Sequence, residues 1–261
     1  MQIELIGCTS SGKSTLAEAV LNHAQHHGVT LLHGDDVLLK SVKAHKIQNR
    51  KARSLLVHLI AFVTVILAYP KYHQFFRFCN QVLKQTGIPI RQRIKQLRRL
   101  IKQTGRYESI SRLRNENEIV LVDEGTVHIA HNIYVHEDAE PDWDQIPEFA
   151  NLVPLPEMVV SLETSREEIL ERTLQRGHSR ISQDNPEATA RFVDQAITTF
   201  DLLKQQPGIR NLLVQVQDQE IVCHISGPDS RLHQFLESLE AVLQKPELQV
   251  APSENQEEVT V

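Results

Sequence analysis

A glycine-rich stretch near the start of the chain has the residue types and spacing of a phosphate-binding loop. Residues 7–14 read Gly-Cys-Thr-Ser-Ser-Gly-Lys-Ser and match G-x-x-x-x-G-K-[ST] at every fixed position. Such glycines let the backbone aim successive N–H groups at phosphate oxygens, and a following helix adds its positive N-terminal end. Lys13 would supply positive charge to the β- and γ-phosphates, and the Ser14 hydroxyl a ligand for Mg²⁺. With ATP and Mg²⁺ as the expected cofactors, the expected nucleotide contacts are Gly7, Thr9, Ser10, Ser11, Gly12, Lys13, Ser14 and Thr15.

An acidic turn follows an apolar segment in the middle of the chain. Residues 118–122 are apolar and β-branched after Glu118, and they end in Asp123-Glu124-Gly125. Open α/β sheets bind their ligands at the carboxyl ends of the strands, which is where these acids would lie. We expect Asp123 to hold Mg²⁺, directly or through water, and Glu124 to orient or deprotonate a nucleophile.

A second acidic pair, Asp35 and Asp36, follows the apolar segment 29–33. A carboxylate at the carboxyl end of a parallel strand would lie beside the bound phosphates, where it can accept a proton from a hydroxyl group. We therefore expect both residues to contact the substrate and Asp35 to act as the catalytic base. The alternative is a solvated turn or a helix N-cap, because Asp is favoured at both.

Three arginines recur at intervals of four residues near the middle of the C-terminal half. Arg172 and Arg176 share one face of an expected helix, and Arg180 follows a glycine. Guanidinium groups stabilise the charge spread over a transferring phosphoryl group, so we expect these arginines to form a catalytic lid. The alternative is a surface helix in which Glu168 pairs with Arg172.

Histidines are frequent, with 13 in the chain, but their spacing makes no convincing metal site. His128 closely follows the Asp-Glu-Gly turn, and we include it among the expected substrate contacts. The cysteines Cys8, Cys79 and Cys223 are odd in number and scattered, so they fit neither a disulfide framework nor a zinc site. This cysteine usage favours a reducing compartment.

The elements that must position these residues alternate between short strands and helices. Five segments are short, apolar and rich in β-branched residues, and a helix is expected directly after the glycine-rich loop. Because helical stretches separate most of the strands, we expect a three-layer α/β fold with a mostly parallel five-stranded sheet and helices on both faces. The expected strands are 3–6, 29–33, 118–122, 158–162 and 212–216, with a sixth strand over 221–225 and a last helix over 230–244.

The segment 40–114 does not fit the alternating plan and is strongly basic. It has 18 Lys and Arg against one acid, Glu108, or about +17, which leaves about −22 on the rest of a chain whose net charge is −5. Within it, the run 55–69 is apolar over 15 residues, shorter than the 18 to 20 or so of a membrane span. Farther on, apolar residues recur at helical spacing among basic ones, as in a basic amphipathic helix: Ile90, Ile94, Leu97 and Ile101.

Three interpretations of this basic segment remain open. It can be a helical subdomain that covers the active site, with the apolar run as its core. It can contact a membrane surface, or it can bind nucleic acid. Residues 1–245 are expected to form one domain with 40–114 as a basic helical insertion, followed by a disordered acidic tail over 246–261. No leader pattern is visible, so we expect a cytoplasmic protein, with peripheral membrane contact as an addition.

Several of these motifs resemble the P-loop kinases of nucleosides, nucleotides and other small molecules. Residues 7–15 resemble the loop of deoxynucleoside and thymidylate kinases, Asp35-Asp36 the acidic turn of uridine-kinase-like enzymes, and 172–180 an arginine-bearing lid. The resemblance covers 1–33, 118–135 and 158–180. It implies a P-loop NTPase fold, a base at Asp35 and phosphate contacts from the lid arginines.

The resemblance has limits that bear on the acceptor. Asp-Glu-Gly at 123–125 replaces the Asp-Arg-Tyr or Glu-Arg-Ser of thymidylate and deoxynucleoside kinases, so their nucleoside contacts cannot be transferred. We expect a kinase that moves the γ-phosphoryl group of ATP to a hydroxyl or phosphate of an anionic or hydroxyl-bearing small molecule, nucleoside-like or sugar-like. The alternative is a P-loop ATPase or nucleotide-dependent switch whose basic arm docks on a membrane or nucleic acid. A homodimer is also open.

Overall fold

The computed structural model describes residues 1–27, 29–44, 46–47, 49–137, 139–177, 181, 185–217, 220–223 and 230–243. Arg180 and the acidic tail 246–261, both the subject of predictions above, lie outside the described residues.

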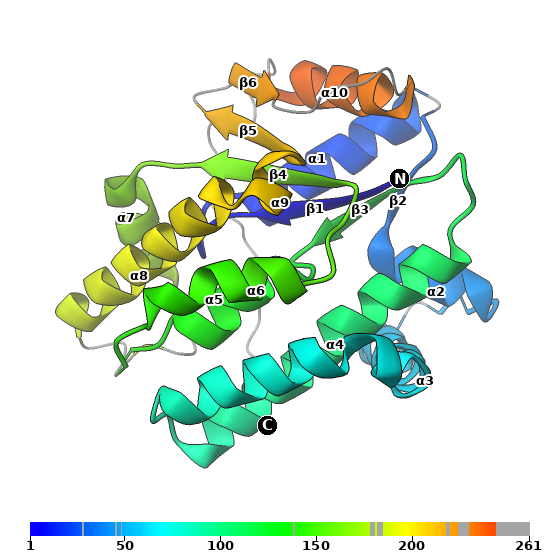
Figure 1. Cartoon of the computed structure of the whole chain (residues 1–261). Helices are drawn as coiled ribbons and strands as arrows, with labels where there is room; N and C mark the ends of the chain where they lie inside the picture. Colours follow the sequence, from blue (N-terminus) through cyan, green and yellow to red (C-terminus); the bar gives the residue numbers. More distant parts are fainter. Residues whose placement is uncertain are drawn as a thin grey trace.

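A six-stranded sheet forms the centre of the fold (Figure 1). The strand order is β2-β3-β1-β4-β5-β6; the first five strands are parallel, and β6 pairs antiparallel with β5. The expected α/β class and parallel five-stranded sheet are confirmed, and the sixth strand is present. The strands are β1 (Gln2–Ile6), β2 (Leu31–His33), β3 (Ile119–Asp123), β4 (Met158–Glu163), β5 (Leu213–Gln217) and β6 (Glu220–Cys223).

Helices cover both faces of this sheet (Figure 1). Neighbouring residues of a strand point to opposite faces, and β4 illustrates this. Val160 packs in a core with Leu16 of α1 and Phe235 of α10, whereas Val159 packs in another core with Phe192 of α8. One face therefore carries α1 (Lys13–His26) and α10 (Ser230–Leu243), and the other carries α5 (Ile129–Tyr134), α6 (Ile146–Leu152) and α8 (Pro186–Gln205).

The chain leaves the neighbouring strands β1 and β3 toward opposite faces of the sheet. After β1 it enters α1 on one face, and after β3 it enters α5 on the other. Ligands of open α/β sheets bind where adjacent connections diverge in this way. The glycine-rich loop and the acidic turn after β3 therefore meet at the carboxyl ends of two neighbouring inner strands. The remaining short helices are η1 (Trp143–Gln145), α7 (Arg166–Arg176) and α9 (Pro207–Arg210).

The basic segment is helical and packs over β2 and β3. It contains the end of α2 (Gly34–Ser41), the 36-residue α3 (Arg50–Gln85) and the 24-residue α4 (Ile90–Leu113). Side chains from all three helices join Val120 and Val122 of β3 in one apolar core; they are Val37, Leu38, Leu39, Val57 and Ile110.

Helices α3 and α4 approach each other very closely at Gly105. A Cβ atom at this position would lie 2.0 Å from the carbonyl oxygen of Ala61 in α3. Only glycine fits there without separating the two backbones. Near the same crossing, Ser109 donates a hydrogen bond to the Thr64 hydroxyl at 2.9 Å, and buried Glu108 accepts one from Tyr72.

The apolar stripe expected on α4 is not its buried face. Ile90 and Ile94 are 60% and 51% exposed, whereas the buried face carries polar side chains. The expected helix is present, Leu97 of the stripe packs against an apolar core, and the buried side of α4 combines Leu100 and Ile110 with polar residues. The buried polar residues of α4 are Gln96, Gln103, Thr104, Arg106, Glu108 and Ser109.

Among the described residues, α3 is the one helix long and apolar enough to cross a membrane by length and composition, and 22% of its most apolar 18-residue stretch is buried. The expectation that the apolar run is too short for a span counted 55–69 alone; the continuous helix is 36 residues long.

Candidate functional site

The glycine-rich loop between β1 and α1 depends on left-handed backbone at its two glycines. Gly7 has φ 144° and Gly12 has φ 91°, values that L side chains rarely adopt. A Cβ on Gly7 would also lie 3.0 Å from Ser11 Oγ and 3.2 Å from the Leu162 carbonyl oxygen. Thr164 helps to fix the loop by donating a hydrogen bond to the carbonyl oxygen of Ser11 at 3.2 Å. Sequence and geometry thus agree on why these positions are glycine.

The lysine of the loop is folded inward. Lys13 Nζ donates hydrogen bonds to the carbonyl oxygens of Gly7 at 3.0 Å and Cys8 at 2.7 Å. Burial lowers the pKa of Lys13, and the nearby carboxylates Glu124 and Asp123 oppose that shift. Helix α1 starts at Lys13 without a side-chain cap, so its first-turn N–H groups remain suited to an anion.

Ser14 and Asp123 meet at the mouth of the loop. Ser14 Oγ donates a hydrogen bond of 2.7 Å to Asp123 Oδ2. The parallel pairing of Leu5 with Asp123 brings the two together, because it sets the ends of β1 and β3 side by side. Asp123 Oδ1 is buried and has no hydrogen-bond partner in the described part of the chain.

These oxygens fit a magnesium ion that arrives with a nucleotide. Mg²⁺ prefers oxygen ligands and is usually held by one or two protein groups, phosphates and water. Among the described residues there is no group of three or more His, Cys, Asp or Glu side chains that would hold a metal by itself. Ser14 and Asp123 would therefore be the protein's share of the coordination.

The turn after β3 is held by a buried glutamate, Glu4. Its side chain is fully buried and accepts backbone N–H bonds from Val127 at 3.1 Å and His128 at 2.8 Å. Burial raises the pKa of Glu4 to about 7, while these N–H bonds favour its charged form. A Cβ on Gly125 would lie 2.4 Å from Glu4 Oε2, so the glycine lets the turn close over this carboxyl group.

Glu124 projects from that turn with left-handed backbone, φ 61°. Its side chain is 55% exposed, and Oε1 lies 3.5 Å from Nε2 of buried His128. Positive φ is uncommon for a residue with a side chain and is associated with functional sites. The turn thus presents Glu124 toward solvent next to Asp123.

A cavity of about 190 Å³ opens beside the loop and this turn. It joins residues from the glycine-rich loop, the end of β3, α4 and α5. They are Thr9, Arg99, Lys102, Gln103, Arg106, Asp123, Glu124, His128, His131 and Asn132. Arg99, Lys102, Gln103 and Arg106 come from α4, within the basic segment, and we call the three cations among them the cationic wall.

A polar network ties α4 to α5 and to the acidic turn. Gln103 Nε2 donates to the carbonyl oxygen of Glu124 at 3.3 Å, and Asn132 Nδ2 donates to Gln103 Oε1 at 3.4 Å. Arg99 Nη1 donates to Asn132 Oδ1 and to Gln96 Oε1, both at 3.3 Å. Such linked hydrogen bonds fix the position of the cationic wall on α4 relative to the acidic turn.

Asp35 and Asp36 do not line this cavity. Both lie in the first turn of α2, which follows β2 directly with His33 as its N-cap. Asp35 Oδ1 is 3.1 Å from Arg106 Nε, and Asp36 Oδ1 is 2.6 Å from Arg53 Nη2. Asp35 is therefore paired with a cavity-lining arginine, and Asp36 is paired with α3.

The expected lid arginines divide into three cases. Arg172 Nη1 lies 3.4 Å from the carbonyl oxygen of Ser10, so it reaches the glycine-rich loop, and its Nη2 also pairs with Glu168. Arg176 is exposed at the end of α7. Arg180 lies outside the described residues.

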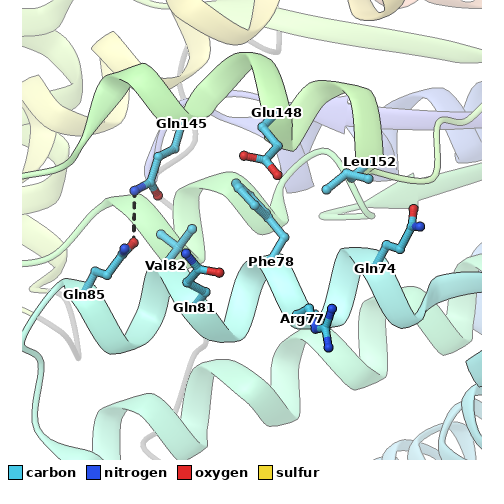
Figure 2. A pocket seen from close by; sticks show the side chains of 9 residues that line it. All are labelled: Gln74, Arg77, Phe78, Gln81, Val82, Gln85, Gln145, Glu148 and Leu152. Atoms are coloured by element: carbon cyan, nitrogen blue, oxygen red, sulfur yellow. Dashed lines mark hydrogen bonds between the residues drawn. The ribbon is translucent and has the colours of Figure 1, made fainter.

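A second cavity, of about 280 Å³, lies between α3 and the α6 region (Figure 2). Its lining is mostly amide and apolar side chains, and Gln145 donates a hydrogen bond of 3.0 Å to Gln85 across it. No residue of the glycine-rich loop or of the strand ends contributes to this lining. The convergent charged groups lie instead in the cavity beside the loop.

Sequence reasoning missed the residues that come together only through the fold. The signal for Glu4 was a lone acid in a strand otherwise expected to be buried. For Arg99, Lys102 and Arg106 the signal was their spacing of three and four residues along one expected helix.

No protein-family model matches this chain, and no curated protein matches it. What can be said of its chemistry therefore depends on the site itself. The site brings together the glycine-rich loop, the hydrogen-bonded pair Ser14 and Asp123, the projecting Glu124 and the cationic wall of α4.

Proposed function

We propose that this protein is an ATP- and Mg²⁺-dependent kinase that transfers the γ-phosphoryl group to a hydroxyl or phosphate of a small-molecule acceptor. The observation that carries the proposal is the hydrogen bond between Ser14 and Asp123 at the mouth of the glycine-rich loop. It joins the loop to an acid at the end of the neighbouring strand β3, and both lie beside the cavity of about 190 Å³.

Each residue has a chemical task in this proposal. The loop N–H groups and Lys13 bind the nucleotide phosphates, so Lys13 must exchange its bonds to Gly7 and Cys8 for phosphate oxygens. Ser14 and Asp123 hold Mg²⁺, which neutralises phosphate charge when it is bound with ATP. Arg172 contributes charge from the side of α7.

Glu124 is the better-placed base for a hydroxyl acceptor. It lines the cavity and is largely exposed, whereas Asp35 is paired with Arg106 and does not line it. The acceptor hydroxyl would pass its proton to the Glu124 carboxylate as its oxygen forms the new bond to phosphorus. Asp35 then serves to position Arg106.

The test combines nucleotide binding with product analysis. Purified full-length protein is incubated with labelled ATP, Mg²⁺ and panels of nucleosides, nucleotides, sugars and sugar phosphates. We expect label in an acceptor, and a loss of about 100-fold or more in transfer for Lys13→Met and Asp123→Asn. Arg98→Gln is the matched control, because Arg98 is exposed on α4 and does not line the cavity.

A second candidate is an ATPase or switch that acts at a membrane, which the exposed apolar side of α3 favours. It predicts ATP hydrolysis that rises with anionic vesicles, with label in free phosphate and none in an acceptor. Absence of transfer across all panels and cell extracts, with intact ATP hydrolysis, would favour this candidate over the kinase.

A further inference from the structure

Helix α4 presents three cations to the cavity beside the glycine-rich loop. Arg99, Lys102 and Arg106 are spaced three and four residues apart, so they lie on one face of the helix. Arg106 is only 7% exposed, and Arg99 and Lys102 are half-buried. Burial lowers the pKa of both Arg99 and Lys102. Withdrawing three cations from water is costly unless an anion compensates them.

The described residues compensate these cations only in part. Arg106 Nε lies near Asp35, but neither Nε nor Nη2 of Arg106 has a hydrogen-bond partner in the described part of the chain. Arg99 bonds the neutral amide oxygens of Gln96 and Asn132. Lys102 makes no ion pair with any described residue, while its neighbours on α4 are also positive.

The charge balance of the cationic wall favours an anionic ligand. Three cations offset by Asp35 leave about two positive charges on this wall, which match a phosphate monoester of charge about −1.5 to −2 near neutral pH. Asp123 and Glu124 also line the cavity, and Glu124 partly opposes the lowering of the pKa of Arg99 and Lys102, so the wall keeps an excess of positive charge of between about one and two. Guanidinium groups suit phosphate because they can donate two parallel hydrogen bonds.

We propose that Arg99, Lys102 and Arg106 form a subsite for a phosphate group that the acceptor already carries. This inference rests on the proposed kinase function and narrows it to phosphorylated acceptors. The phosphate of the acceptor would dock on α4, and its reacting oxygen would face the nucleotide loop.

The test uses inorganic phosphate as the probe and a non-hydrolysable ATP analogue to fill the nucleotide loop. Binding of the analogue with Mg²⁺ is measured first; its failure to bind would count against the proposed function itself. Phosphate is then titrated into the analogue-loaded full chain. We expect saturable phosphate binding that weakens about tenfold or more in the double variant Arg99→Gln/Lys102→Gln, with Arg98→Gln unchanged.

Two results would overturn the subsite while leaving nucleotide binding intact. One is equal phosphate affinity in the double variant and in Arg98→Gln. The other is a double variant that loses analogue affinity as strongly as phosphate affinity, since the cations would then contact ATP. Sulfate and acetate serve as comparison arms, and acetate that binds as tightly as phosphate would contradict a dianionic ligand.

A separate observation concerns the outer side of α3. Six large apolar side chains recur there at helical spacing, each about half exposed or more, over about 18 Å of helix. They are Leu55 (72% exposed), Leu59 (56%), Phe62 (49%), Val63 (48%), Ile66 (56%) and Leu67 (68%). We call this the α3 apolar face.

The opposite side of α3 is already occupied. Val57, Ala61, Val65 and Ala68 are buried, and Ala61 contacts α4 at Gly105. The helix is therefore held on the domain along one side, and the α3 apolar face remains open. Soluble domains rarely leave so many adjacent apolar side chains in water without a partner.

Charge decides between the occupants of the α3 apolar face. Glu108, the one acid in 40–114, is buried, and the partly exposed Asp36 is paired with Arg53 near the start of α3, so the basic segment keeps a large excess of positive charge. Two copies paired through this face would bring two segments of about +17 together, which disfavours a symmetric dimer. An apolar face on a strongly basic segment matches a membrane with anionic head groups.

We infer that the α3 apolar face rests on an anionic lipid surface. The test is co-sedimentation of the full chain with vesicles of phosphatidylcholine alone or mixed with phosphatidylglycerol. We expect recovery on the mixed vesicles that falls at least about tenfold in Leu59→Gln/Ile66→Gln. Leu174→Gln, which removes an exposed apolar side chain from α7, is the matched control.

Equal recovery of the double variant and Leu174→Gln would overturn this inference. So would concentration-dependent dimers that the double variant abolishes without any recovery on vesicles, because a second copy would then cover the face. Because these positions are exposed, we expect the variants to keep the Tm of the wild type. An unchanged Tm shows that reduced recovery on vesicles reflects lost membrane binding and not unfolding.

Discussion

Gly105→Ala offers a sharp test of how the basic segment is assembled. The change adds one methyl group in the middle of α4, and helix propensity alone predicts a gain of about 1 kcal/mol. The structure predicts the opposite sign. The new Cβ would lie 2.0 Å from the Ala61 carbonyl oxygen and 2.6 Å from its carbon, which are backbone atoms that cannot rotate away.

The size of the effect follows from this overlap. An ordinary carbon–oxygen contact is longer than 3 Å, so α3 and α4 must separate by more than about 1 Å, and overpacking of this kind costs about 1–3 kcal/mol or more. Separation also removes contacts in the core that joins Val57 and Ile110 to β3. We expect a net loss of about 3 kcal/mol, or roughly 5–10 °C in Tm for a chain of this size.

The assay is thermal unfolding followed by circular dichroism, with Gly208→Ala as the control. A Cβ on Gly208 would lie 3.5 Å from Leu155 Cδ1, an ordinary contact, so this second helical glycine should tolerate alanine or gain slightly. A Tm for Gly105→Ala equal to or above that of the wild type would refute the close crossing of α3 and α4.

Three further predictions concern titration and the metal pair. Burial raises the pKa of Glu4 from 4.5 to about 7, so the folded state binds this proton more tightly than the unfolded state does. The free energy of unfolding should therefore fall by up to about 3 kcal/mol as the pH rises from 4.5 to 7. Urea titrations across this pH range should show a smaller fall in Glu4→Gln. Burial alone would raise the pKa of Glu108, but hydrogen bonds from Tyr72, Lys71 and Arg112 lower it to about 2. The charged carboxylate should therefore contribute up to about 3 kcal/mol to the free energy of unfolding above pH 4.5, and this contribution should be lost as the pH falls toward 2. In Glu108→Gln the free energy of unfolding should depend less on pH in this range. Asp123→Asn keeps an acceptor for Ser14, so its Tm should change little while the Mg²⁺ dependence of nucleotide binding, measured by calorimetry, disappears; an unchanged Mg²⁺ dependence would exclude Asp123 as a ligand.

The sequence predicted the strands of the sheet well because buried parallel strands are short, continuous apolar segments that are easy to recognise. The segments around Ile3, Val120 and Val160 all became buried strands. The second strand starts at Leu31 rather than Val29, and helix α2 begins at once after it. Asp35 and Asp36 therefore lie in the first turn of that helix, with His33 rather than either Asp at the N-cap.

The candidate site was only half visible because half of it depends on contacts between distant segments. The glycine-rich loop and Asp123 follow from neighbouring residues in the sequence. The pairing of Asp35 with Arg106 and the closure of Gly125 over Glu4 join residues that are far apart along the chain. Basic residues on a helix look solvated in sequence, and only the packing of α4 turned three of them toward the cavity.

The central claim is tested most directly by asking where the γ-phosphoryl group of ATP goes. Labelled ATP, Mg²⁺ and a panel of phosphorylated small molecules are incubated with the protein, and the label is divided between acceptor and free phosphate. The account predicts that most of the label enters one acceptor class and that Lys13→Met abolishes this transfer. Label found in free phosphate alone, at a rate unaffected by any acceptor, would contradict it.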